Sequence, residues 1–244
     1  MRNLLILIAI IAFTVTTGCQ SAKETATADS PATEGGAATT ESNDRAEPKA
    51  PAESAGAAVD SKGTQATPPA PDGMAKATFA GGCFWCMEKP FDKVDGVEAT
   101  ISGYTGGTEK HPTYEAVARK QTSHIEAVEI VYDPSKVTYE KLLDVFWRQV
   151  DPTDNGGQFV DRGPQYRPAI FVHDDAQRKT ARASKKALGD SGRFDEAIVV
   201  EIMDAEVFWR AEEYHQDFYK KSPIRYNGYR RGSGRDQFLE KHWE

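Results

Sequence analysis

Residues 76–86 read KATFAGGCFWC, and this stretch decides how the folded part of the chain is built. Lys76 to Gly81 has the composition of a short strand, which the pair Gly81-Gly82 ends with a turn. Cys83 to Val94 then has the pattern of a helix, in which Pro90 predicts a kink or a late start. Cys83 is therefore expected where a strand gives way to the first turn of a helix.

Strands and helices follow one another without a strict βαβ rhythm in the rest of this region. Apolar or alternating runs predict strands over residues 97–104, 124–132, 169–173 and 197–203, and helical patterns predict helices over residues 113–119, 138–150, 174–188, 211–219 and 234–243. A long polar loop, residues 151–167, lies between two of them, and loops of that length are often functional. We predict one α+β two-layer domain over residues 75–244, with a central mixed or antiparallel sheet.

Two segments precede this domain. Leu4 to Val15 is a short apolar run, and Thr16, Thr17 and Gly18 lead from it into Cys19. This pattern resembles the signal of bacterial lipoproteins, so residues 1–19 are expected to be an export signal with lipidation at Cys19. Thr16 departs from the usual Leu, and ordinary secretion is the alternative.

The segment between the export signal and the domain differs sharply in composition from both. Residues 20–73 contain no Leu, Ile, Phe, Tyr, Trp or Met, so residues 20–74 are expected to be a disordered tether. A lipidated Cys19 and this tether together predict a location in the cell envelope. The domain would be held at a membrane and face the periplasm or the exterior.

The charge pattern argues against a nucleic-acid partner. The chain carries a net charge of −7, and no part of it is strongly basic. The cluster of Arg230, Arg231 and Arg235 near the end is expected to form a solvated face. We therefore predict no nucleic acid among the partners.

Cys83 and Cys86 are the only cysteines of the predicted domain. Backbone N–H groups at a helix start favour a negative charge, so the position of Cys83 predicts a lowered pKa and a reactive thiolate. Cys86 lies three residues later on the same helical face, within reach of a disulfide. The predicted domain contains no further cysteine and the five histidines of the chain are scattered, which argues against a metal site. The pair fits either a thioredoxin-like disulfide oxidoreductase or an oxygen-atom acceptor that passes through a sulfenic acid.

A set of motifs separates these two classes. The motifs are Gly82-Cys83-Phe84-Trp85, Gly103-Tyr104-Thr105-Gly106-Gly107, Pro112-Thr113-Tyr114, Ser123-His124-Ile125-Glu126, Asp161-Arg162-Gly163-Pro164-Gln165-Tyr166-Arg167 and Ala211-Glu212-Glu213-Tyr214-His215. In this order and spacing, residues 75–243 closely resemble methionine sulfoxide reductase A. The resemblance implies a ferredoxin-like core for the predicted α+β domain. It departs from many members in having Cys86 where they have Gly, Ile125 where they have Ala, and no C-terminal cysteine.

The resemblance also implies a role for each site residue. Cys83 is the nucleophile and Glu126 the general acid. Glu126 shares its alternate row with Val128 and Ile130, so its carboxyl group is expected on an apolar face; from the residues alone, an edge carboxylate paired with an arginine is an equal alternative. The remaining roles are Tyr114 and Tyr166 as donors to the sulfoxide oxygen, Asp161 as support, and Phe84 and Trp85 as the pocket for the methyl group.

The implied reaction reduces methionine (S)-sulfoxide, free or in proteins, to methionine. Oxygen transfer leaves Cys83 as a sulfenic acid, Cys86 resolves it to a disulfide, and a thioredoxin-type partner reduces that disulfide. No metal or organic cofactor is implied.

Overall fold

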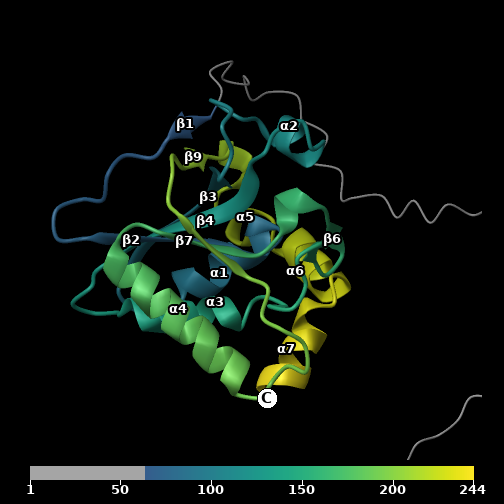
Figure 1. Cartoon of the computed structure of the whole chain (residues 1–244). Helices are drawn as coiled ribbons and strands as arrows, with labels where there is room; N and C mark the ends of the chain where they lie inside the picture. Colours follow the sequence, from purple (N-terminus) through teal and green to yellow (C-terminus); the bar gives the residue numbers. More distant parts are fainter. Residues whose placement is uncertain (1–63) are drawn as a thin grey trace, which may run out of the picture. The chain divides into compact units, whose positions relative to one another are not determined.

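A seven-stranded mixed sheet forms the centre of the domain, in the order β1-β9-β3-β4-β2-β7-β8 (Figure 1). The computed structural model describes residues 64–244, so the predicted export signal, Cys19 and residues 20–63 of the predicted tether lie outside the described residues. The strands of the sheet are β1 (Gln65–Ala66), β2 (Ala75–Ala80), β3 (Val97–Thr105), β4 (Ile125–Tyr132), β7 (Ala169–Val172), β8 (Glu201–Asp204) and β9 (Trp209–Arg210). The helices are α1 (Phe84–Asp92), α2 (Tyr114–Ala118), α3 (Tyr139–Trp147), α4 (Asp175–Asp190), α5 (Phe218–Lys221), α6 (Pro223–Gly232) and α7 (Arg235–Trp243).

Four of the strands form a ferredoxin-like core. They are antiparallel and lie in the order β3-β4-β2-β7, with α1 between β2 and β3 in the chain and α3 between β4 and β7. β8 then pairs parallel to β7 after α4, which makes the sheet mixed. The predicted α+β architecture is confirmed.

The main hydrophobic core lies between this sheet and the helices α1, α3 and α4, which Figure 1 shows together on one side of it. Phe79 of β2 stacks on Phe91 of α1 at a ring-centroid distance of 5.4 Å and on Phe146 of α3 at 5.1 Å. Aromatic pairs of this geometry add to the free energy gained by burying the rings. The last turn of α1 is thereby held against the centre of the sheet.

The predicted tether ends earlier than residue 74. β1 pairs antiparallel with β9, and Thr64 Oγ1 donates a hydrogen bond of 2.7 Å to the Pro112 carbonyl. Backbone pairing needs no apolar side chain, so a composition poor in hydrophobic residues did not reveal this strand.

The C-terminal region differs most from the prediction. Instead of one helix over residues 211–219, the chain forms the 3-10 helix η2 (Glu213–His215) and then α5, because Gln216 and Asp217 leave helical geometry and Asp217 has a φ of 53°. α6 was not predicted, since Gly228 and Gly232 break its pattern. The strand predicted over residues 197–203 begins only at Glu201.

The predicted long loop over residues 151–167 has some structure of its own. It contains a hairpin of β5 (Gly157–Gln158) and β6 (Asp161–Arg162) and the 3-10 helix η1 (Pro164–Tyr166).

Glu88 places a carboxyl group inside the fold. Its side chain is buried on α1, and Oε1 accepts a hydrogen bond of 2.9 Å from the Asp217 N–H. Burial raises the pKa of Glu88 to about 7. A folded-state pKa above the unfolded value of about 4.3 means that folding takes up a proton between these values, so this group's contribution to stability is lost as the pH rises toward 7.

We therefore expect Glu88→Gln to weaken the pH dependence of stability. Between pH 5 and pH 8 the free energy of unfolding of the wild type should fall more than that of the variant, by on the order of 2 kcal/mol, because the amide cannot ionise. Urea unfolding at the two pH values measures this difference. The exposed Glu98→Gln is the matched control and should behave as the wild type; an identical pH dependence in Glu88→Gln would contradict the prediction.

Candidate active site

Cys83 lies at the junction of β2 and α1, as the sequence predicted. It is the residue that precedes the first turn of α1, and 8 % of its surface is exposed. Gly82 makes the junction possible, because its φ of +82° and the closeness of Gln158 leave no room for a side chain. Cys83 is therefore fixed by the turn at the helix start and is almost completely buried.

Glu126 meets this junction from β4. Its side chain is 1 % exposed, and its Oε2 accepts a hydrogen bond of 3.1 Å from the backbone N–H of Phe84. Val128 and Ile130, two and four residues further along the strand, belong to the core on the α1 side of the sheet. The prediction that Glu126 lies on an apolar face is confirmed, and the alternative of a sheet-edge carboxylate is wrong.

The expected lowering of the Cys83 pKa is wrong. Burial raises the pKa of the Cys83 thiol well above its ordinary value, and the nearby charges of Glu126 and Asp161 raise it further. The N–H of Trp85 donates to Cys83 and opposes this change without reversing it. The helix start alone predicted a stable thiolate, but desolvation and two neighbouring acids outweigh it.

Phe84 and Trp85 form an aromatic wall beside Cys83. Trp85 stacks on Phe218 with centroids 3.7 Å apart, and its indole N–H donates a hydrogen bond of 3.0 Å to His215 Nδ1. Phe84 packs against His215 at 4.9 Å. Both residues are buried, so the wall is part of the core as well as of the predicted substrate pocket.

His215 joins this wall to Tyr114. The Tyr114 ring lies 4.4 Å from the His215 ring, and burial lowers the pKa of His215 to about 3. The imidazole is therefore neutral, and since its Nδ1 accepts from Trp85, its Nε2 carries the proton. The sequence analysis quoted His215 in a motif without a role; only its place among these rings identifies it as part of the site.

Glu212 fixes the position of Tyr114. Its Oε1 accepts a hydrogen bond of 2.8 Å from the Tyr114 backbone N–H, and its Oε2 accepts one of 2.8 Å from the hydroxyl of Tyr104. One carboxylate thus links the start of α2 to β3. Sequence reasoning missed this role because Glu212 lies about a hundred residues from both partners.

Asp161 and Tyr166 reach the site from the 151–167 segment. The hydroxyl of Tyr229 donates to Oδ1 and Oδ2 of Asp161, each at 2.5 Å, and the charge of Asp161 raises the pKa of Cys83. Tyr166 is buried at the end of η1, which packs against β4. Tyr229, which no sequence signal indicated, holds Asp161 toward the cysteines.

Cys86 lies one turn into α1 and is completely buried. Its backbone N–H donates to the Cys83 carbonyl at 3.0 Å, and both cysteines are free thiols. Cys83 is thus the more accessible sulfur of the pair.

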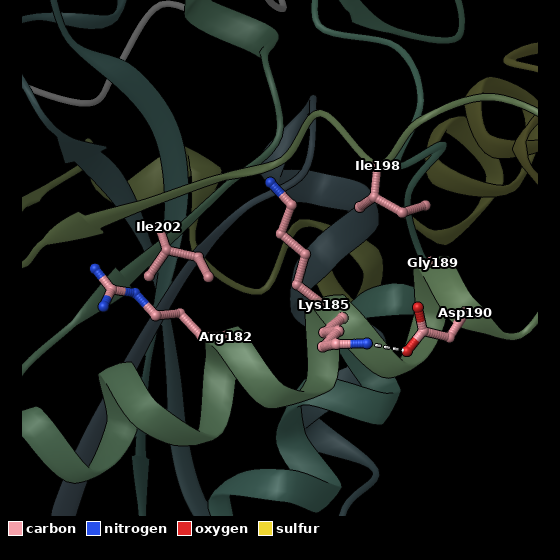
Figure 2. A pocket seen from close by; sticks show the side chains of 7 residues that line it. Arg182, Lys185, Gly189, Asp190, Ile198 and Ile202 are labelled. Carbon is pink, nitrogen blue, oxygen red and sulfur yellow. Dashed lines mark hydrogen bonds and ion pairs between the residues drawn. The ribbon is translucent and has the colours of Figure 1, made fainter.

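Metal-binding groups, membrane-spanning helices and surface hollows are the other features that could carry a function away from the two cysteines. Among residues 64–244, no group of three or more His, Cys, Asp or Glu side chains is arranged to hold a metal ion. Within the same residues, no helix combines the length and apolar character of a membrane span. A surface hollow of about 500 Å³ beside α4 (Figure 2) is lined by Arg182, Lys185, Lys186, Gly189, Asp190, Ile198 and Ile202 and contains none of the predicted site residues.

Comparison with known proteins agrees with this geometry. A protein of Bacillus licheniformis described as peptide methionine sulfoxide reductase MsrA is 59 % identical over 167 residues, which cover 68 % of this chain and 92 % of that protein. A protein of Bacillus subtilis with the same description is 58 % identical over 167 residues, covering 68 % of this chain and 94 % of that protein.

Solved structures give the same result. The reduced form of Mxr1 from Saccharomyces cerevisiae superposes with a TM-score of 0.59 at 32 % identity, covering 63 % of this chain and 88 % of that one. Methionine sulfoxide reductase A of Corynebacterium diphtheriae gives 0.55 at 31 % identity, covering 63 % and 77 %. The family model described as peptide methionine sulfoxide reductase matches residues 75–244. The chain therefore belongs to the peptide methionine sulfoxide reductase family.

Proposed function

We propose that this chain reduces methionine (S)-sulfoxide, free or in oxidised proteins, to methionine, with Cys83 as the nucleophile and Glu126 as the general acid. The observation that carries the proposal is the buried carboxyl group of Glu126 hydrogen-bonded to the Phe84 N–H, next to Cys83. A carboxyl group in that position can give a proton to an oxygen bound beside the thiol. Disulfide exchange transfers no oxygen atom, so it does not require an acid that protonates an oxygen.

Oxygen transfer needs one proton and one electron pair. The sulfoxide oxygen takes a proton from the Glu126 carboxyl group, which makes the sulfoxide sulfur the better electrophile, and the resulting carboxylate takes the proton of the Cys83 thiol as its sulfur attacks. The S–O bond of the substrate breaks, methionine leaves, and Cys83 keeps the oxygen as a sulfenic acid. Because burial raises the pKa of Cys83, the resting enzyme holds a thiol, and this thiol loses its proton to the Glu126 carboxylate only after that group has protonated the substrate.

The aromatic residues supply the binding site. Phe84 and Trp85 receive the methyl group of the substrate, whose apolar surface suits their rings. Tyr114 and Tyr166 donate hydrogen bonds to the sulfoxide oxygen. Asp161 of β6, which accepts a hydrogen bond from Tyr229, supports the bound substrate. These roles follow the family resemblance, and the support for Tyr114 is its ring contact with His215, which also packs on Phe84 and Trp85.

Cys86 completes the cycle. It condenses with the sulfenic acid to form the Cys83–Cys86 disulfide and water, and a thioredoxin-type protein reduces the disulfide by exchange. The position of both sulfurs at the start of α1 supports this step.

We also propose that Cys19 is lipidated and that the domain is held at a membrane of the cell envelope, facing the periplasm or the exterior. The support is in the sequence: a short apolar run ends at Thr17-Gly18-Cys19, and a long Ala-, Thr- and Glu-rich segment separates it from the domain.

The proposed activity is tested with each epimer of a methionine sulfoxide peptide and a thiol reductant. We expect methionine from the S epimer only. Cys83→Ser should produce none, because a hydroxyl is a very weak nucleophile at neutral pH. Methionine is measured by chromatography. Methionine from the serine variant would mean that the nucleophile is elsewhere, and no methionine from the wild type would reject the activity.

Glu126→Gln should slow oxygen transfer by about 10²–10⁴-fold, the usual contribution of a general acid. The amide keeps the shape of the carboxyl group and can still accept the Phe84 hydrogen bond, so the fold should survive. Single-turnover methionine formation gives the rate. Glu129→Gln, on the same strand, is the control for loss of a buried carboxylate. A change of less than threefold in Glu126→Gln would leave Glu126 a structural residue.

Lipidation is tested by metabolic labelling with a fatty acid. The full chain should incorporate label and Cys19→Ala should not, because a thiol is needed to attach the lipid. Gel fluorography after membrane fractionation reports both label and location. Equal labelling of the two proteins would reject the anchor.

A further inference from the structure

Arg235 is the most completely buried charged residue near the cysteines. It is 0 % exposed, which shows that the solvated face expected for the C-terminal arginines is wrong at this position. Its Nη2 donates to the Gly81 carbonyl at 3.0 Å and its Nη1 to the Gln149 carbonyl, while Nη1 also lies 3.8 Å from Met87 Sδ. Within residues 64–244, the structure gives Arg235 no carboxylate partner and its Nε no hydrogen-bond partner.

Arg230 reaches the same place from α6. Its Nη1 donates a hydrogen bond of 3.2 Å to the carbonyl of Cys86 itself. That carbonyl is available because the residue four positions later is Pro90, which has no N–H to donate within the helix. Arg230 also pairs with Asp236 at 2.7 Å, so its position is fixed from both sides.

These two cations oppose the burial of Cys86. Burial raises the pKa of the Cys86 thiol above its ordinary value, and Arg235 and then Arg230 oppose this rise without reversing it. The other ionisable groups that act on Cys86 are the acids Asp161 and Asp236, the thiol of Cys83, and the phenols of Tyr226 and Tyr229. Cys83 faces the acids Glu126 and Asp161, both of which raise its pKa. The surroundings of the two sulfurs therefore differ, since Cys86 has two cations beside it as well as the acids.

We propose that Arg230 and Arg235 form a cationic seat for the thiolate of Cys86, which makes Cys86 the attacking sulfur when the disulfide forms and the leaving sulfur when it is reduced. The inference rests on the proposed function and adds a role for two arginines that no step of it used. A buried guanidinium without a carboxylate is costly, and an anion at Cys86 offsets that cost.

In the forward direction, the Cys86 thiolate attacks the sulfenic sulfur of Cys83. The S–S bond forms, the S–O bond breaks, and the departing hydroxide becomes water by taking up a proton equivalent to the one that the Cys86 thiol released on ionising. Cys86 is oxidised by this step, and Cys83 gives up its oxygen. The rate depends on the fraction of Cys86 that is thiolate, and the arginines set that fraction.

In the reverse direction, the thiolate of the reductant attacks Cys83 and Cys86 leaves as a thiolate. A lower pKa makes a better leaving group, and the arginines lower the pKa of Cys86. Accessibility favours the same choice, since 8 % of Cys83 and 0 % of Cys86 is exposed. The reductant is thus joined to Cys83 in the mixed disulfide.

The first test separates the two chemical steps in one sample. The full chain with the substitution Cys19→Ala is first reduced and freed of reductant. It is then mixed with one equivalent of a methionine (S)-sulfoxide peptide. Samples are quenched at successive times, and methionine is measured by chromatography. Mass spectrometry measures the sulfenic acid, which is trapped with dimedone, and the Cys83–Cys86 disulfide. The measured quantity is the rate of disulfide formation divided by that of methionine formation, from pH 6 to pH 10.

Arg235→Met should lower this ratio at pH 7 by about tenfold or more, the size of effect that a close buried charge has on an ionisation. Because loss of the cation raises the pKa of Cys86, the ratio should recover as the pH rises, and Arg235→Lys should restore most of it. Arg231→Met, an exposed arginine of α6, is the matched control and should leave the ratio unchanged. Cys86→Ser cannot form the disulfide, so it gives the value of the ratio when this step is absent.

The outcomes distinguish the two proposals. If the wild type forms no methionine, the proposed function fails; if methionine forms but Arg235→Met leaves the ratio and its pH profile unchanged, the cationic seat is rejected. Should Arg235→Met not fold, as judged by circular dichroism, Arg230→Met carries the same expectation with a smaller effect.

The second test maps the mixed disulfide. The oxidised chain is mixed with a thioredoxin whose second active-site cysteine is replaced by serine, and the joined peptides are identified by mass spectrometry. We expect thioredoxin on Cys83. A mixed disulfide mainly on Cys86 would overturn the assignment of Cys86 as the leaving sulfur.

Discussion

The site depends on the hydrogen bond that joins the backbone N–H of Phe84 to Oε2 of Glu126. It ties the first turn of α1 to the centre of the sheet and holds a carboxyl group beside Cys83. A helix start has unpaired N–H groups, and here one of them is used by a buried acid instead of by a capping side chain at Cys83. The rest of the site is built around this contact, since the aromatic wall continues along α1 and Tyr104 pairs with Glu126 across β3 and β4.

The electrostatics of the two cysteines follow from which elements face them. Cys83 lies toward β4 and the β5–β6 hairpin, which supply Glu126 and Asp161 and favour its neutral form. Cys86 lies one turn further, toward α6 and α7, which supply Arg230 and Arg235. A division of labour between two chemically identical side chains thus arises from the packing of distant segments on one short helix.

The C-terminal helices have a larger part in the site than their composition suggests. α6 provides Tyr229, which holds Asp161, and Arg230, which binds the Cys86 carbonyl. α7 provides Arg235, which bridges the Gly81 and Gln149 carbonyls. In this chain the C-terminal segment contains no cysteine, and its contribution is to the hydrogen bonding and charge around the pair in α1.

The strand–turn–helix at Cys83, the apolar face that carries Glu126 and the α+β architecture could all be predicted from the sequence alone. These features depend on local spacing: glycines at a turn, period-two alternation along a strand, and motifs in a fixed order. Only the tertiary structure decided the direction of the Cys83 pKa, the neutral state of His215, the burial of Arg235 and the pairing of Gln65 and Ala66 with β9. Each of these results from groups far apart in the chain, because desolvation and charge interactions depend on what packs against a residue and not on its neighbours in sequence.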